Sequence, residues 1–222
     1  DAGKVGVRAG AITSATDGVE IRLSGPGGHP ARPEQTVDMV TLAARVAAEL
    51  PGRVADVIGA DLVRLVFGSI QSGEAMNVIP AHARLRASVR TPSEEAWDQI
   101  PDVVSASVHA IVDDDRAEVD IHHVRGIPPV VNDATATALA TEAIADEVGS
   151  DRITEAIQSW GGDDFAWYLR QVPGSYIRLG THDPDSDNDH LDLHAGHFDA
   201  DERAIATGVR LLAATAVRQL ES

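Results

Sequence analysis

The sequence has no cysteine, a single lysine at position 4, and no apolar run approaching about 18 residues. Without cysteine the chain forms no disulfide, no thiolate nucleophile and no cysteine-ligated zinc site. The lack of Lys/Arg runs and a net charge of −17 argue against nucleic acid or an anionic membrane as a partner. Without a spanning segment or a signal-peptide pattern, we expect a cytoplasmic location. Small molecules and metal cations stay open as ligands.

The 222 residues, of which 43% are hydrophobic, are enough for one large or two small domains with a real core. The chain starts inside a strand-like pattern, in which Val5 and Val7 alternate with Gly6 and Arg8, and it has no initiating Met. We therefore expect the sequence to be a piece of a longer product.

Alternating and helical patterns follow one another through the first half of the chain. They predict a strand, a helix, two strands, a helix and a strand, over residues 17–25, 35–50, 62–70, 82–90, 93–112 and 117–124. Pro51-Gly52 is expected to stop the first helix, Ser93 to cap the second, and Pro101 to kink or restart it. This β-α-β-β-α-β order predicts a ferredoxin-like module, a four-stranded antiparallel sheet backed by two helices.

The pattern changes after Gly126-Ile-Pro-Pro129. A helix over 133–148, a strand over 175–180 and a closing helix over 203–220 indicate an α/β layer with too few strands to close a core. We therefore predict three segments: 1–12 and 126–222 as two parts of one interrupted domain, and 13–125 as the four-stranded module inserted between them.

The nine histidines are distributed unevenly. His82, His109 and His122 are expected at the surface, and His123 to be a hydrogen-bonded core histidine. Four others fall within sixteen residues, beside alternating aspartates: His182, His190, His194 and His197. Imidazoles mixed with carboxylates suit zinc, manganese or a similar divalent ion.

The acidic run 183–189 also has the alternating carboxylates of a calcium loop. The match fails where a calcium hand requires glycine and a bidentate glutamate, because Asn188 and His194 stand there. A solvated acidic loop is the favoured interpretation.

Three further short segments combine glycine, polar side chains and strand ends. Gly27-Gly28-His29 follows a strand, Asn77 lies in the long loop before Pro80, and Gly161-Gly162-Asp163 precedes a short helical segment. Arg90, which ends a strand, is placed to bind a carboxylate bidentately. Each also has a structural interpretation: a turn, a surface loop, an exposed strand end, or a capped turn with Phe165 and Trp167 in the core.

Taken in order, these segments resemble the aminoacylase, hippurate hydrolase and indoleacetyl-amino-acid hydrolase family of metal-dependent amidohydrolases. Members carry Gly-Gly-His, Asn-x-Ile-Pro, Val-Arg, Gly-Glu-Asp-Phe and a C-terminal His-x-Pro-x-Phe-x-x-x-Glu run. The corresponding residues here are His29, Asn77 to Pro80, Val89-Arg90, Gly162 to Phe165, and His194 to Glu202. Asp163 replaces the usual Glu, and Gly196 replaces the usual Pro.

The resemblance implies that 1–12 is a catalytic-domain stub, that 13–125 is an inserted lid or dimerisation domain, and that 126–222 is the C-terminal part of an α/β catalytic domain. It also implies a role for each matching residue. His194 is a metal ligand, and His29 is the lid histidine that reaches the scissile carbonyl oxygen from the partner subunit. Asn77 and Arg90 bind the substrate, with Gly162 and Asp163 also at the substrate site.

The resemblance further implies that the other metal ligands and the general-base Glu precede Asp1, in the missing half of the catalytic domain. We therefore expect an incomplete, by itself inactive portion of a zinc- or manganese-dependent enzyme that hydrolyses N-acyl amino acids or peptide-like substrates. It is expected to form a homodimer through the lid. The alternative is a non-catalytic dimerisation or ligand- and cation-binding module.

Overall fold

The computed structural model describes residues 1–113, 116–186, 194, 196 and 198–221. Within it the chain forms two compact units. The central unit comprises Thr13–Pro129 and Ser159–Asp164, and the terminal unit comprises Asp1–Ile12, Val130–Gln158 and Phe165–Ser222. Each unit is described by itself.

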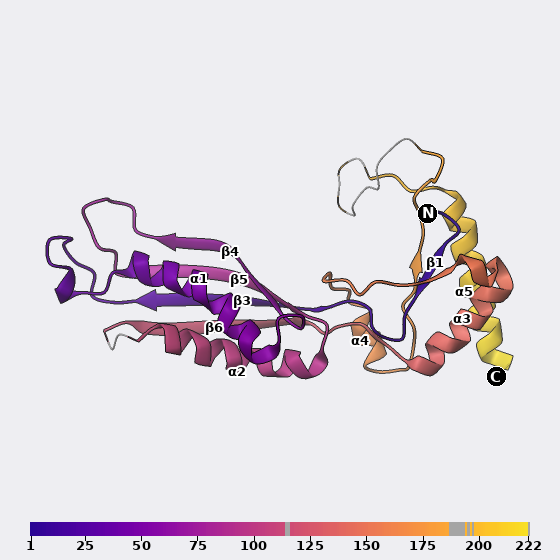
Figure 1. The fold of residues 1–222 in the computed structure, drawn as a ribbon, viewed down its shortest axis with the longest axis horizontal. Coiled ribbons are helices and arrows are strands. Elements are labelled where there is room, and N and C mark those ends of the chain that lie inside the picture. The colour runs from indigo at the N-terminus through magenta and orange to yellow at the C-terminus, as the bar shows by residue number, and fades with distance from the viewer. Residues whose placement is uncertain (114–115, 187–193, 195, 197, 222) are drawn as a thin grey trace. The chain divides into compact units, whose positions relative to one another are not determined.

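The central unit is a four-stranded antiparallel sheet with two helices along one face (Figure 1). Its strands lie in the order β4-β5-β3-β6, so β4 and β6 form the edges. In chain order its elements are β3 (Ala15–Ser24), a 3-10 turn (Pro33–Gln35), α1 (Met39–Ile58), β4 (Arg64–Ser72), β5 (His82–Thr91), α2 (Glu94–Ile111) and β6 (Glu118–Ile127).

The two helices begin at side-chain caps and run through their prolines. Asp38 caps α1 by accepting from the Thr41 N–H at 3.1 Å, and Ser93 caps α2, as the sequence predicts, by accepting from the Ala96 N–H at 3.1 Å. The predicted stop of the first helix at Pro51 is wrong, because α1 continues to Ile58. Pro51 costs roughly 3 kcal/mol in a helix interior, but buried Leu50 and Val54 keep the helix packed on the sheet. Pro101 likewise lies inside one continuous helix, Glu94–Ile111, so α2 does not restart there.

One hydrophobic core joins this sheet to its helices. Val19, Ile21 and Leu23 of β3 alternate toward it, and Leu85 at the centre of β5 is fully buried. Burying one such side chain contributes about 1.5–3 kcal/mol. The opposite face of the sheet, called the open face below, carries polar and charged side chains.

The terminal unit contains short strands and three helices. β1 (Val5–Val7) lies between β8 (Ile153–Glu155), to which it is parallel, and β9 (Arg178–Leu179), to which it is antiparallel. β2 (Gly10–Ala11) pairs with β7 (Val131–Asn132). The helices are α3 (Ala134–Val148), α4 (Ala166–Leu169) and α5 (Arg203–Glu221), and a 3-10 turn spans Ser150–Arg152. The expected single strand over 175–180 is thus only two residues long.

The unit boundaries differ from the expected segments 1–12, 13–125 and 126–222 in two places. The central unit extends to Pro129, and Ser159–Asp164 belongs to it although the flanking residues belong to the terminal unit. Ser14 explains the second difference: its N–H donates to Gly161 O at 2.9 Å and its hydroxyl donates to Ser159 O at 3.0 Å.

Among the helices that the structure describes, none combines the length and apolar character needed to cross a membrane. The cytoplasmic location stays a prediction.

Candidate functional site

Two of the segments singled out in the sequence meet at one end of the central sheet. Gly28 and Ile79 form an antiparallel bridge, with the Gly28 N–H donating to Ile79 O at 3.0 Å and the Ile79 N–H donating to Gly28 O at 2.8 Å. Gly27 has φ +65°, and a Cβ there would lie 3.2 Å from that of Ala81, so both backbone conformation and space favour glycine. The bridge brings His29 and the Asn77 loop to the same end of the unit.

The His29 ring is exposed, and its protonation pattern is set by the local backbone. Nδ1 accepts a hydrogen bond from the Ala31 N–H at 3.0 Å. A neutral ring with Nδ1 as acceptor carries its proton on Nε2. Nε2 has no hydrogen-bond partner among the described residues, so its N–H is available to a ligand.

Arg90 and Gly162 gather at the opposite end of the sheet. Arg90 is the register partner of Thr16 on β3 and of Arg64 on β4. The 159–164 segment crosses this end of the open face: a Cβ on Gly162 would lie 2.5 Å from Thr16 Cγ2, so a side chain does not fit there. Asp163 follows directly and is half-buried. The close approach gives Gly162 a packing role, and its substrate-binding role stays a prediction.

The two ends are far apart within one chain. Ser24 pairs with His82 at the His29 end, and Thr16 pairs with Arg90 at the other. Ser24 lies eight positions after Thr16 on β3, a span of roughly 26 Å at the usual rise per residue. The predicted site residues therefore form two groups, His29 with Asn77 and Arg90 with Gly162 and Asp163, that do not meet inside one central unit.

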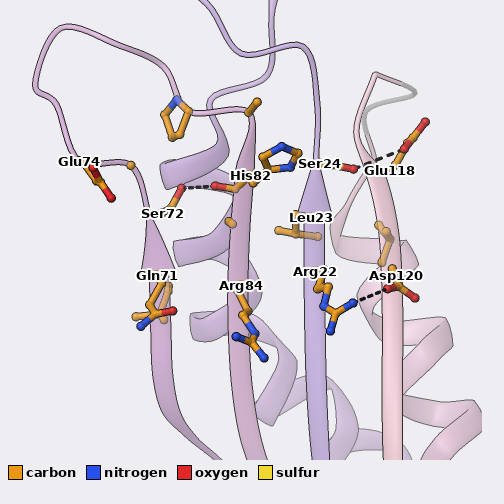
Figure 2. A pocket seen from close by; sticks show the side chains of 16 residues that line it. Arg22, Leu23, Ser24, Gln71, Ser72, Glu74, His82, Arg84, Glu118 and Asp120 are labelled. Carbon is orange, nitrogen blue, oxygen red and sulfur yellow. Dashed lines mark hydrogen bonds and ion pairs between the residues drawn. The ribbon is translucent and has the colours of Figure 1, made fainter.

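The open face near His82 contains a shallow pocket of about 1150 Å³ (Figure 2). Its charged groups are largely paired with one another: Arg22 lies 3.6 Å from Asp120, and the Ser24 hydroxyl donates to Glu118 at 3.4 Å. Next to the pocket, Glu20 accepts from Arg84, Arg86 and Arg22, and these hydrogen bonds lower the pKa of Glu20 to about 2. The face is thus held together by charge pairing across three strands.

A buried carboxylate joins three elements of the central unit. Asp17 accepts from Trp97 Nε1 at 2.8 Å and from the Gly126 N–H at 2.9 Å, and it lies 2.6 Å from His123 Nε2. Burial alone raises the pKa of Asp17, but the hydrogen bonds from His123, Gly126 and Trp97 outweigh it, and the net pKa is lowered. His123 is therefore the hydrogen-bonded core histidine that the sequence predicts, and its role is structural.

His194 lies in the terminal unit. It is exposed, and its φ of 73° makes it the one non-glycine residue in the left-handed region among those the structure describes. In the described part of the chain no group of three or more His, Asp or Glu side chains is placed to hold a metal ion. His190, His197 and the acidic positions 187 and 189 lie outside the described residues.

The beginning of the acidic run has local partners. Asp183 accepts from the Asp185 N–H at 3.1 Å and from Arg203 at 2.7 Å. Of the aromatic residues expected in the core after Gly162, Phe165 packs against a buried cluster, whereas Trp167 is 46% exposed.

No sequence motif marks Arg64 or Trp160 as a site residue. The Arg64 guanidinium lies 4.0 Å from the centroid of the Trp160 ring, and Arg64 stands opposite Arg90. An arginine at the start of a strand carries no signal by itself. Only the strand register, which sequence patterns do not fix, could have linked it to Arg90.

The geometry defines a mixed α/β protein with an antiparallel module and polar groups gathered at both ends of its sheet. A family model described as Peptidase family M20/M25/M40 matches residues 2–218. The chain therefore belongs to this hydrolase family.

Three relatives illustrate the likeness. N-acetylcysteine deacetylase of Bacillus subtilis (strain 168) is 30% identical over 99% of this chain and 56% of its own length. A crystal structure of Bacillus subtilis YXEP protein, described as a dinuclear metal-binding peptidase from the M20 family, is 27% identical with a TM-score of 0.78, over 99% of this chain and 54% of that one. The chain spans about half the length of these two proteins.

The third relative, a putative glutamate–cysteine ligase 2-3 of Rhodococcus jostii (strain RHA1), is 38% identical over 96% of this chain. The match covers only 27% of that protein, so its name describes a molecule that is mostly unmatched here.

Proposed function

We propose that this chain is the lid and C-terminal catalytic portion of a metal-dependent amidohydrolase that cleaves the amide bond of N-acyl amino acids or small peptide-like substrates. Its central unit is then a ferredoxin-like lid inserted into a zinc-peptidase-like catalytic domain. The family match across residues 2–218 supports the reaction class, and the deacetylase relative supports the substrate class. The observation that carries the proposal is the placement of His29 and Arg90 at opposite ends of one sheet.

The chain joins a second copy through the edge strand β4. Apolar side chains are exposed on β4 and on the α1 side of the unit, where Val66 is 63% and Val57 64% exposed. The tip of the Asn77 loop adds Met76, which is fully exposed, and Val78. Unpaired strand edges and exposed apolar groups together favour pairing with a partner of the same kind.

Pairing two β4 edges about a twofold axis makes the two strands antiparallel. Ser72, at the His29 end of one copy, then lies beside Arg64, at the Arg90 end of the other. The two groups of site residues, which are separated within one chain, come together between chains. The substrate site proposed here thus takes His29 and Asn77 from one subunit and Arg90, Gly162 and Asp163 from its partner.

Each group has a chemical role that follows from its geometry. The His29 Nε2–H, free because Nδ1 is occupied by Ala31, donates to the carbonyl oxygen as negative charge develops on it. Arg90 binds the substrate carboxylate with two parallel N–H donors. Asn77, on the loop joined to His29 through the Gly28–Ile79 bridge, donates to the substrate backbone.

Zinc or manganese is the proposed cofactor, with His194 as one ligand. When bound, such an ion polarises the amide carbonyl and lowers the pKa of an attacking water. Among the described residues there is no cluster sufficient for a metal, and the proposal takes the remaining ligands and the general base from outside them. The exposed apolar side of α5, which includes Ile205 and Leu212, offers a surface against which such a part can pack.

The test is hydrolysis of N-acetyl and N-benzoyl amino acids by the full-length gene product, with metal content measured in parallel. His194→Ala should lose metal and activity together. Arg90→Ala should keep its metal and lose on the order of 2–4 kcal/mol in kcat/KM, the scale of a charge-assisted contact to a carboxylate. Arg53→Gln, an exposed position on α1 that pairs with Glu49, is the matched control. Chelator-insensitive hydrolysis, or none on any N-acyl amino acid, would contradict the proposal.

A further inference from the structure

Two arginines face each other at the Thr16 end of the open face. Arg64 of β4 and Arg90 of β5 are register partners, and both point to the open face because their neighbours Leu65 and Val89 are buried. Among the described residues, the only side-chain partner of Arg90 is the Ser88 hydroxyl, to which its Nε donates a hydrogen bond at 3.2 Å. Within the described part of the chain, the only such partner of Arg64 is the ring of Trp160. Like charges directly opposite on neighbouring strands destabilise a sheet. An anion bound between the two guanidinium groups would offset this repulsion, so the pair indicates an anion-binding site.

The other arginines of the open face are paired with carboxylates. Arg84 and Arg86 both donate to Glu20, and Arg22 also pairs with Glu20. Arg22 reaches Asp120 as well (Figure 2). The chain carries 35 acidic against 18 basic residues, so carboxylates to pair with arginine are plentiful. Arg64 and Arg90 are the arginines of this face that have no carboxylate partner among the described residues.

The Arg64 guanidinium is held in place. Trp160 belongs to the 159–164 segment, which is fixed to the sheet by the Ser14–Gly161 hydrogen bond and by the close approach of Gly162 to Thr16. Stacking on an indole orients the guanidinium plane while leaving its N–H donors free at the edge. Such a plane is suited to bidentate binding of a carboxylate.

We propose that Arg64 binds a second carboxylate of the substrate, next to the one bound by Arg90. Side chains directly opposite on neighbouring strands start about 5 Å apart at Cβ, a spacing that a short dicarboxylate spans. The preferred substrates are accordingly N-acyl amino acids that carry two carboxylates, the second on the amino acid or on the acyl group. The identification of this anion as part of a substrate rests on the proposed function; the anion site itself does not.

The anion site is tested by NMR titration of the 222-residue chain with glutarate and with butyrate, following the three tryptophan indole N–H signals. Glutarate should shift the Trp160 signal, assigned from a Trp160→Phe spectrum, at about tenfold lower concentration than butyrate, a difference of about 1.4 kcal/mol. Equal midpoints for the two anions would overturn the proposal.

Variants separate anion binding from a merely structural role of Arg64 as a clamp on Trp160. Arg64→Gln should abolish the preference for glutarate, Arg64→Lys should restore part of it, and Arg53→Gln, which removes one arginine from the opposite face, should leave it unchanged. A preference that survives in Arg64→Gln would also overturn the proposal.

Hydrolysis by the full-length gene product identifies which part of the substrate carries the second carboxylate. N-acetylglutamate, N-succinyl-leucine and N-acetyl-leucine are compared by kcat/KM in wild type and Arg64→Gln. One of the two diacids should exceed N-acetyl-leucine about tenfold in wild type and lose that advantage in the variant. An enzyme that hydrolyses all three equally retains the proposed function and overturns this inference. Glutarate binding without any hydrolysis supports the anion site and contradicts the function.

Discussion

The central unit buries its apolar side chains in one continuous core, whereas the terminal unit divides a smaller set between two separate clusters. The core of the central unit includes β3, β4, β5 and both helices. Among the described residues, each cluster of the terminal unit contains four buried residues, one around Val5 and one around Ile12. On α5 of the terminal unit, Leu211 is 1% exposed and the adjacent Leu212 is 70% exposed. The difference shows that the central unit has the more extensive core of its own, while one side of α5 in the terminal unit leaves apolar side chains exposed.

The largest expected effect is on the central core. Leu85→Ala removes a fully buried side chain from the middle strand and should lower the free energy of unfolding by about 2–5 kcal/mol. Urea denaturation monitored by circular dichroism measures the change. A loss below about 1 kcal/mol would show that this core is not the main source of the unit's stability.

A somewhat smaller loss in the free energy of unfolding is expected from changes to the buried hydrogen bonds of Asp17. The Asp17 side chain is 1% exposed and joins β3, α2 and β6 through His123, Trp97 and Gly126. Asp17→Asn leaves part of this network unsatisfied and should cost about 3 kcal/mol. His123→Gln serves as the comparison, because it removes the partner but retains the carboxylate; an unchanged urea midpoint for Asp17→Asn would refute the structural role.

The charge cluster on the open face predicts a pH dependence. The pKa of Glu20 falls from an ordinary 4.5 to about 2 in the folded protein, so its contribution to stability is present above about 4.5 and is lost as pH falls toward 2. Glu20→Gln should therefore be less stable than wild type at pH 7, and the gap should close between about pH 4.5 and 2. A gap that is constant over this window would contradict the pairing.

The smallest effect is expected on the outer side of α5. Leu212→Ala should change the stability of this chain by no more than about 0.5 kcal/mol, because the side chain is already exposed to water. Leu211→Ala, one position earlier and buried, is the matched control and should cost at least about 2 kcal/mol. A large loss for Leu212→Ala would mean that this side of α5 is already covered.

Local patterns predicted much of the central unit from sequence. The alternation in β3 and the cap Ser93 located elements correctly because they depend on neighbours in the chain. Pro51 was misjudged because the burial of Leu50 and Val54, a tertiary effect, outweighs its local cost. β2, β7 and β8, of two or three residues each, were missed because such short pairings have no periodicity to detect.

The candidate site was predictable as a set of residues but not as a geometry. Motifs selected His29, Asn77, Arg90, Gly162, Asp163 and His194, and strand register then divided five of them between two ends of a sheet. Register also added Arg64, which no motif marks. The division of the site residues and the pairing of Arg64 with Arg90 both depend on which strands pair and in which register. A single sequence constrains strand pairing only weakly.

The central claim is that the substrate site combines the His29 end of one subunit with the Arg90 end of another. A heterodimer of the full-length gene product, with His29→Ala in one chain and Arg90→Ala in the other, tests it most directly when purified through two different affinity tags. If each site takes His29 from one chain and Arg90 from the other, both substitutions fall in the same site, and the second site stays intact. The heterodimer should then show roughly half of wild-type activity, while both homodimers of the variants stay near background. Near-background activity in the heterodimer would mean that each site lies within a single chain, and would contradict the account.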